Sequence, residues 1–223
     1  MTPRTADTAL LLSELARYKP MVLDEIGRVV ASRRLRPTLR ELLLEYPLRE
    51  GKGLRPALCL ATCEALGGRL EDALTSAAAL ELFHNAFLVH DDIEDESLSR
   101  RGDGTMAEKY GRAIAINVGD ALNVLSASCL LENTGTIGLE RSLRIFREVE
   151  RMARESVEGQ ALELAWRTHN TVELDAADYL RLILKKTCWY TTIFPTRVGA
   201  LIATRDRVDL DRYLRFAFFV GAA

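Results

Sequence analysis

The sequence predicts an all-α protein, and three observations support this. Long stretches are rich in Leu, Ala, Arg and Glu, which are good helix formers. Apolar residues in these stretches recur at the three- and four-residue spacing of a helix face. β-Branched runs are few, and the 223 residues include only six prolines. Because no linker, repeat or low-complexity tract interrupts the chain, we expect a single domain over residues 1–223.

The first two predicted helices lie before residue 50. The first covers about residues 8–30 and places one apolar set on a common face, namely Leu11, Leu15, Leu23 and Ile26. Pro20 is expected to kink it. Pro37 suits the first turn of a short second helix, which we expect to end near Tyr46 and Pro47.

Further helices follow along the rest of the chain. They are predicted over residues 57–66, 70–97 and about 107–132, then from Leu139, from Asp175 and from Asp209. Gly135 and Gly138 indicate a turn between two of them. The run Ala77–Ala79 in the second of these helices is expected to let a neighbouring helix approach closely.

Composition and charge exclude several classes of protein. A hydrophobic content of 48% with 28% charged residues is typical of a soluble globular protein. A net charge of −2 gives no support for nucleic-acid binding. We find neither an uninterrupted apolar run of membrane-spanning length nor the layout of a signal peptide, so we expect a cytoplasmic protein without stable membrane insertion. The four cysteines are predicted to be reduced core thiols: Cys59, Cys63, Cys129 and Cys188.

An acidic cluster at the end of the helix predicted over residues 70–97 is the strongest chemical signal. Asp91 and Asp95 are one turn apart on the same helix face, and Asp92 flanks them. Such carboxylates repel one another and destabilise the helix, and a bound divalent cation such as Mg²⁺ would remove this repulsion. Arg100 and Arg101 follow at once and offer donors suited to phosphate. Carboxylates for metal beside arginines for phosphate predict a metal-bridged diphosphate site.

A second anion-binding pattern precedes this helix. Gly51 and Gly53 flank Lys52 in a turn that leads into an apolar helix, and Arg55 adds another positive charge. Backbone N–H groups at such a helix start can bind an anion. Taken alone, the pattern is better explained by a basic loop before a helix.

Together these motifs resemble the trans-isoprenyl diphosphate synthases, the polyprenyl synthetase family, and in particular geranylgeranyl and farnesyl diphosphate synthases. The family carries a GKxxRP motif, a first DDxxD motif and a following RRG, all present here in that order. The resemblance implies the isoprenoid synthase fold, a helical bundle around a central cavity, a homodimer and dependence on Mg²⁺. It extends over the whole chain.

The resemblance also implies roles for individual residues. Mg²⁺ would be held by Asp91, Asp92 and Asp95. Isopentenyl diphosphate would be held by Lys52, Arg55, His84 and Arg101. The allylic diphosphate would be contacted by Arg100, Lys186 and Thr187. The segment Gly159–Glu163 matches the family's GQxxD, with Glu163 in place of Asp. The resemblance implies that Gln160 contacts the substrate and that the acid reaches a metal-bound water or the allylic substrate, a contact that the longer side chain of Glu163 would shift outward.

Product length would depend on residues just before the acids. In the family these are the positions four and five before the first Asp, here Phe87 and Ala86, and Phe83 lies one turn deeper. Simple core packing of both rings is an equal alternative on spacing alone. A ring at position 87 argues against very long products.

The chain ends on an apolar run, and the sequence contains no second DDxxD. From the resemblance we expect that the family's C-terminal helices are missing from this chain.

The predicted reaction is Mg²⁺-dependent head-to-tail condensation of an allylic diphosphate with isopentenyl diphosphate. Geranylgeranyl diphosphate is the preferred product and farnesyl diphosphate the next. Two alternatives stay open: a class I terpene cyclase of the same fold, and an inactive subunit that regulates a full synthase.

Overall fold

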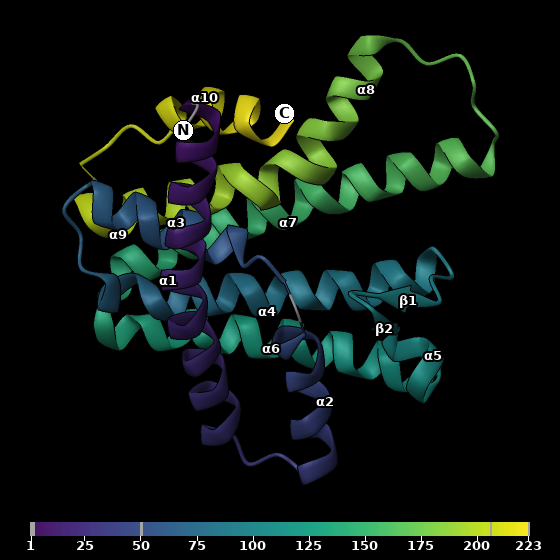
Figure 1. The fold of residues 1–223 in the computed structure, drawn as a ribbon, viewed down its shortest axis with the longest axis horizontal. Coiled ribbons are helices and arrows are strands. Elements are labelled where there is room, and N and C mark those ends of the chain that lie inside the picture. The colour runs from purple at the N-terminus through teal and green to yellow at the C-terminus, as the bar shows by residue number, and fades with distance from the viewer. Residues whose placement is uncertain (1–2, 50, 206, 223) are drawn as a thin grey trace. The chain divides into compact units, whose positions relative to one another are not determined.

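Helices make up nearly all of the structure, which confirms the all-α prediction (Figure 1). This computed structural model describes residues 3–49, 51–205 and 207–222. Its helices are α1 Pro3–Ser32, α2 Pro37–Leu48, α3 Leu54–Ala65, α4 Leu70–Glu94, α5 Met106–Tyr110, α6 Arg112–Thr136, α7 Leu139–Thr168, α8 Ala176–Leu182, the π-helix η1 Ile183–Ile193, α9 Phe194–Thr204 and α10 Asp211–Ala222. A short antiparallel hairpin joins α4 to α5 and consists of β1 Ser99–Arg100 and β2 Asp103–Gly104.

The chain divides into two compact units. The first unit comprises the residues up to Ala57 together with Leu74–Asn133. The second comprises Leu58–Ala73 together with the residues from Thr134 onward. The expectation of one domain over residues 1–223 stays a prediction, and residues 1, 2 and 223 lie outside the described chain.

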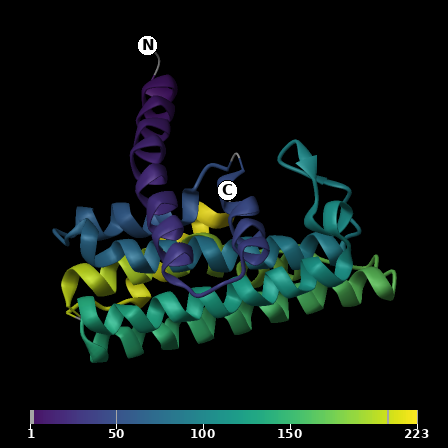
Figure 2. The same cartoon turned by 90° about the horizontal axis from the view of Figure 1, so that it is seen from below.

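The core of the first unit is the antiparallel pair α4 and α6, which lie side by side in Figures 1 and 2. The Ser126 hydroxyl donates to the carbonyl of Ala79 at 2.8 Å, and the Asn133 amide donates to the Ser76 hydroxyl at 2.8 Å. The alanines of α4 are fully buried here, as expected from their small size. At the other end of the pair, Gly119 leaves room for the ring of His90.

The N-terminal helices α1 and α2 run antiparallel to each other in the first unit (Figure 1). Tyr18, Val22 and Ile26 are buried where α1 packs on the unit. The N-terminal end of α1 projects away from α4 and α6 (Figure 2), and its residues 10–12 are exposed.

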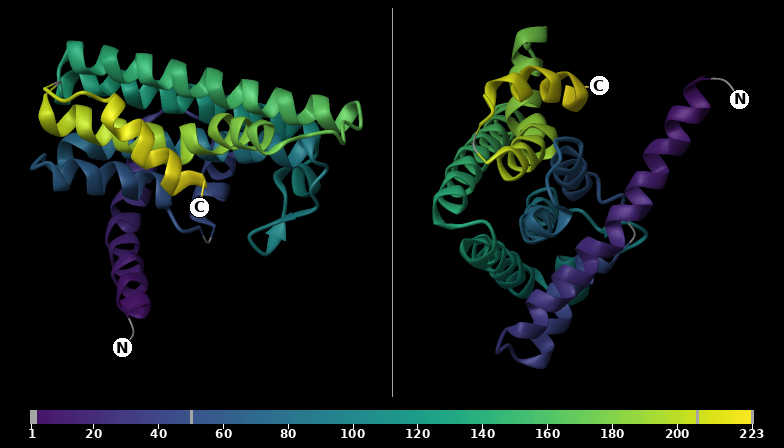
Figure 3. Two further views of the ribbon diagram at one scale, coloured as in Figure 1. Left: turned by 90° about the horizontal axis from the view of Figure 1, so that it is seen from above. Right: turned by 90° about the vertical axis from the view of Figure 1, so that its left-hand side faces the viewer.

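The second unit is built around η1, which packs against α7 and α10 (Figure 3). Glycines allow two of these approaches. A Cβ at Gly159 of α7 would lie 2.5 Å from the backbone nitrogen of Lys186, and a Cβ at Gly221 of α10 would lie 2.6 Å from the Thr192 hydroxyl. The Thr192 hydroxyl in turn donates to the carbonyl of Ala217 at 2.7 Å.

Several predicted helix ends differ from those observed. The helix predicted over residues 70–97 ends at Glu94, because Glu96 adopts a left-handed φ of 50°. Ser97 N–H then donates to the carbonyl of Asp92 at 2.9 Å, and Glu96 N–H points to that of Ile93 at 3.4 Å. These are the two bonds of a Schellman ending.

The helix predicted over residues 107–132 is split in two. Gly111 has a φ of 88°, which ends α5 and starts α6. In contrast, α6 continues through Gly135, where a turn was predicted, and α2 continues through Pro47. Helix α1 likewise continues through Pro20. The π-helix η1 was not predicted.

Among the described residues, helix α6 is long and apolar enough to span a membrane by length and composition alone, although polar residues such as Asp120 interrupt its apolar run. It has 25 residues and a mean hydropathy of 1.6 over its most apolar window, of which 44% is buried inside the protein. The core helix of a soluble protein passes the same test. The four cysteines are free and buried, which confirms that prediction.

Candidate functional site

The acidic cluster lies in the first unit, at the C-terminal end of α4. Asp91 is partly exposed and Asp95 is exposed, whereas only 1% of the Asp92 side chain is accessible. The N–H of Asp95 donates to the carbonyl of Asp91 at 2.8 Å, so the two residues keep helical spacing although α4 has ended. Burial therefore separates Asp92 from the other two acids.

Asp92 is engaged by protein partners. The Tyr46 hydroxyl of α2 donates to one carboxylate oxygen at 2.7 Å, and Arg100 Nε donates to the other at 2.7 Å. The same Tyr46 oxygen accepts the N–H of Met106 at 2.8 Å. Burial and the bond to Asp92 raise the pKa of Tyr46 to about 12. A buried carboxylate with an arginine and a hydroxyl on its two oxygens is well compensated for its lost hydration.

The hairpin sets the direction of the two arginines. Arg101 and Gly102 have φ angles of 54° and 80°, the left-handed pair typical of a type I′ turn. Arg49 holds the hairpin from α2: it donates to the carbonyls of Arg100 at 3.2 Å and Gly104 at 2.8 Å. Arg100 therefore faces the acids, with Nη2 3.4 Å from Asp91, while Arg101 sits at the turn.

His84 of α4 lies close to two arginines, Arg55 and Arg101. Arg55 Nη1 is 3.2 Å from His84 Nε2. Burial, and then the charges of Arg55 and Arg101, hold the pKa of His84 well below its usual value. His84 is therefore neutral at pH 7, and its Nε2 accepts from Arg55, which places the ring proton on Nδ1.

The position of Arg101 explains why the first residue of the GKG turn, Gly51, is a glycine. A Cβ there would lie 2.8 Å from Arg101 Nη1, so the missing side chain makes room for the guanidinium group. Gly53 has a φ of 62°. Lys52 between them is exposed.

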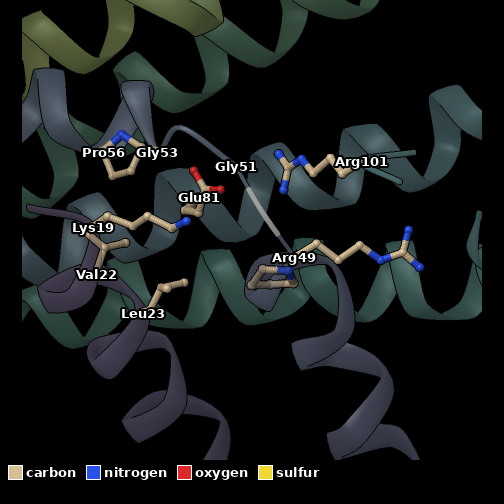
Figure 4. A pocket seen from close by; sticks show the side chains of 10 residues that line it. Lys19, Val22, Leu23, Arg49, Gly51, Gly53, Pro56, Glu81 and Arg101 are labelled. Carbon is tan, nitrogen blue, oxygen red and sulfur yellow. The ribbon is translucent and has the colours of Figure 1, made fainter. Parts of the chain in front are cut away.

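A pocket opens between this turn, α1 and α4 (Figure 4). Its lining includes Lys19, Arg49, Gly51, Glu81 and Arg101. Glu81 is 7% exposed and accepts from the Asn85 amide at 3.2 Å. Burial raises the pKa of the Glu81 carboxyl above its usual value, although the nearby charges of Arg55, Arg101 and Lys19 oppose this shift.

The residues predicted to set product length lie together on α4. The rings of Phe83 and Phe87 meet edge to face, with centroids 4.7 Å apart, and both are half-buried. Ala86 beside them is fully buried.

The remaining predicted residues lie in the second unit. Lys186 on η1 forms an ion pair with Glu163 of α7. Thr187 and Gln160 are half-buried. Gly159, next to Gln160, lets the backbone of η1 reach α7. The predicted position of Lys186 opposite the acids concerns both units and stays a prediction.

Four residues of the site were missed from the sequence: Lys19, Tyr46, Arg49 and Glu81. Tyr46 and Arg49 lie near the end of an ordinary amphipathic helix, where nothing marks a polar role. Glu81 offered a signal, because it lies one turn before His84 on the same face of an otherwise apolar helix.

The donors at the acidic cluster bear on the predicted Mg²⁺ site. Within residues 3–49, 51–205 and 207–222, no three His, Cys, Asp or Glu side chains form a metal-holding group. Asp91 and Asp95 nevertheless keep accessible carboxylates one turn apart, which suits a hard cation that retains several waters. Asp92 fits a supporting role instead.

Comparison with known proteins decides the family. The polyprenyl synthetase family model matches residues 36–223. The chain belongs to the polyprenyl synthetase family.

Individual polyprenyl synthetases are also similar in sequence and structure. Geranylgeranyl diphosphate synthase of Cyanophora paradoxa is 31% identical over 96% of this chain and 71% of its own length. The crystal structure of geranylgeranyl pyrophosphate synthetase from Pyrococcus horikoshii aligns with a TM-score of 0.87 at 28% identity, over 96% of this chain and 64% of that one. A geranylgeranyl pyrophosphate synthase from Corynebacterium glutamicum, complexed with isoprenyl diphosphate and magnesium, aligns with a TM-score of 0.83 at 25% identity, over 93% and 65%.

The chain is shorter than most of these relatives. It spans about two thirds of the two polyprenyl synthetase structures and about half of several other curated members, such as those of Methanothermobacter thermautotrophicus and Fischerella ambigua. The predicted helical fold and family membership are both confirmed by these similarities.

Proposed function

We propose that the protein is a trans-prenyltransferase that condenses an allylic diphosphate with isopentenyl diphosphate, with geranylgeranyl diphosphate as the product. One observation carries this proposal. Helix α4 carries acids suited to a metal ion at its C-terminal end and, two turns earlier, His84, whose Nε2 atom lies 3.2 Å from Nη1 of Arg55 on α3. Two helical turns correspond to roughly 10 Å, room for two diphosphates side by side.

The first group would hold the allylic substrate. Asp91 and Asp95 would bind Mg²⁺, which supplies charge neutralisation for the diphosphate as it leaves. Asp92 would not bind the ion directly but would orient Arg100, which it holds through Nε at 2.7 Å and Nη2 at 2.6 Å, so that the guanidinium group stays beside the acids and could donate to a phosphate oxygen. Lys186 and Thr187 of the second unit would contact the same diphosphate, as the family resemblance implies.

The second group would hold isopentenyl diphosphate. Lys52, Arg55 and Arg101 provide the positive charge, and neutral His84 can donate from Nδ1 while Arg55 occupies Nε2. In the reaction, the C1–O bond of the allylic substrate breaks and pyrophosphate takes the electron pair. The isopentenyl double bond then attacks C1, and a proton leaves from the new unit. We assign no protein base to this proton, because the family resemblance implies that pyrophosphate accepts it.

Phe83 and Phe87 would limit the chain length of the product. Each residue lies one turn deeper than the last, measured from Asp91, so a growing chain that runs along this face would meet Phe87 first. Phe87→Ala should therefore lengthen the products, which mass spectrometry of the extracted prenyl alcohols would show. An unchanged product distribution would place the end of the cavity elsewhere.

The relatives named geranylgeranyl diphosphate synthase support this activity over a terpene cyclase. A cyclase needs only one diphosphate site, and the cluster around Arg55 and Arg101 would then have no role. A cytoplasmic location and a homodimer are also proposed, the latter from the family resemblance, and light scattering would test the dimer.

The activity is tested by incubating the protein with Mg²⁺, isotopically labelled isopentenyl diphosphate and each of dimethylallyl, geranyl and farnesyl diphosphate. We expect label in a longer prenyl diphosphate. Release of a hydrocarbon from geranylgeranyl diphosphate alone would favour the cyclase. Altered product length only when a complete synthase is added would favour the regulatory subunit.

A further inference from the structure

The pocket of the first unit includes a charged side chain from α1, a helix that carries none of the motifs, and Val22 and Leu23 of the same helix line it as well. Lys19 lines this pocket together with Gly51, Gly53 and Arg101. It lies outside residues 36–223, which the family model matches. The place of Lys19 in the pocket is therefore shown by the structure alone and does not follow from any of the motifs.

Packing fixes the stem of Lys19. A Cβ at Gly53 would lie 3.8 Å from Lys19 Cβ and 3.7 Å from its Cγ, so the aliphatic part of the side chain runs along the glycine turn. The neighbouring residues Tyr18 and Val22 are each 2% exposed and anchor α1 at this point. Figure 4 shows the ammonium end of Lys19 pointing toward Glu81.

The charges around the pocket leave a positive excess. Glu81 provides one buried carboxylate, and the cations whose charges act on it include Arg55, Arg101 and Lys19. One negative charge cannot balance three positive ones, so the pocket attracts an anion. A diphosphate, with several negative charges and many acceptor oxygens, matches this surplus.

We propose that Lys19 is a further binding residue for the diphosphate of isopentenyl diphosphate. Its ammonium group binds a phosphate oxygen from the α1 side of the pocket, opposite the turn that carries Arg101. Glu81 keeps the ammonium group directed into the pocket before the ligand arrives. This assignment rests on the proposed function, because it names an additional contact for the same substrate.

The test compares Lys19→Met, which keeps the length of the stem and removes the charge, with the unchanged protein. Loss of one charge-assisted bond should raise KM for isopentenyl diphosphate roughly tenfold. The KM for farnesyl diphosphate and kcat should change less than about twofold, since Lys19 does not touch that substrate. Lys19→Arg should restore most of the affinity, because it keeps the positive charge.

Arg17→Met is the matched control. Arg17 lies on the same helix and carries the same charge, but it is exposed and pairs with Glu14 at 3.2 Å. Its loss should leave both KM values unchanged. An unchanged KM for isopentenyl diphosphate in Lys19→Met would overturn the proposal, as would a lowered melting temperature without that change, which would show a structural ion pair only.

A binding measurement separates this proposal from the proposed function. Titration calorimetry with inorganic pyrophosphate, without Mg²⁺, reports on the cationic pocket whether or not the protein is active. Weaker binding in Lys19→Met than in Arg17→Met would support the site even if no prenyl product forms. Equal binding in the two variants would refute it.

Discussion

Asp92 shows how burial divides three neighbouring acids into two kinds. The sequence predicts the acids, the arginines and their common purpose, because these depend on residue type and local spacing. It does not predict that Asp92 turns inward, because that depends on Tyr46, which approaches from a different helix. A contact between residues so far apart in the chain leaves no local pattern.

The two kinds of acid should respond differently to neutralisation. Asp92→Asn weakens bonds to Tyr46 and Arg100 in a buried place, and should lower the free energy of unfolding by roughly 1–3 kcal/mol. Asp95→Asn, on an exposed carboxylate, should change it by less than about 0.5 kcal/mol and yet reduce prenyl transfer strongly. Urea denaturation and product assays on both variants measure this. Equal stabilities would contradict the supporting role of Asp92.

His84 makes stability depend on pH. Its folded pKa lies well below the usual 6.5, so beneath pH 6.5 the unfolded chain binds a proton that the folded chain does not. The contribution of His84 is therefore complete above pH 6.5 and is lost as the pH falls, by about 1.4 kcal/mol per pH unit for one proton. His84→Gln should remove this part of the slope between pH 6.5 and 5. Parallel stability curves for the two proteins would contradict the neutral, buried histidine.

At the scale of elements, the sequence predicts which segments are helical better than where they end. The interruptions depend on backbone conformations that the pattern of apolar residues does not encode. Glu96 takes a left-handed conformation that glycine would adopt more easily, and Gly111 breaks a helix while Gly135 does not. The sequence pattern does not distinguish the π-helix η1 from an α-helix, because its apolar residues also fit α-helical spacing.

Gly159 should be essential to the packing of α7 against η1. In Gly159→Ala the new methyl group would lie 2.5 Å from Lys186 N and 2.8 Å from its Cα, so the two helices must separate. We expect lower stability and a weakened pair between Lys186 and Glu163. Gly135→Ala is the control: it has open space and should be neutral, or stabilising by up to about 1 kcal/mol, as expected for alanine in a helix. Thermal unfolding measures the stability of both variants, and equal melting temperatures would contradict the essential role of Gly159 in this packing.

For the whole molecule, we propose that the two diphosphates bind to different sets of residues. The acids and the cluster around Arg55 belong to the first unit, and Lys186 belongs to the second. The family resemblance predicted these two binding sets from motifs spread along the chain. The composition of each unit does not reveal them, because both units are built from ordinary amphipathic helices.

Steady-state kinetics can test that division. Lys186→Ala should raise KM for the allylic diphosphate, and Lys52→Ala should raise KM for isopentenyl diphosphate, each by roughly tenfold for one lost charge-assisted contact. Each variant should leave the other KM nearly unchanged. A reversed pattern would show that the two sites have been exchanged in this account.

The most direct measurement of the central claim is the position of a bound metal ion. Crystals grown with pyrophosphate and Mn²⁺, a stand-in for Mg²⁺ with the same preference for carboxylate oxygen, would give an anomalous signal. We predict a peak within coordinating distance of carboxylate oxygens of Asp91 and Asp95 and of the pyrophosphate, with Asp92 still bound to Tyr46 and Arg100. A pyrophosphate bound without metal at these acids, or a metal ion on Asp92 in place of its present partners, would contradict the account.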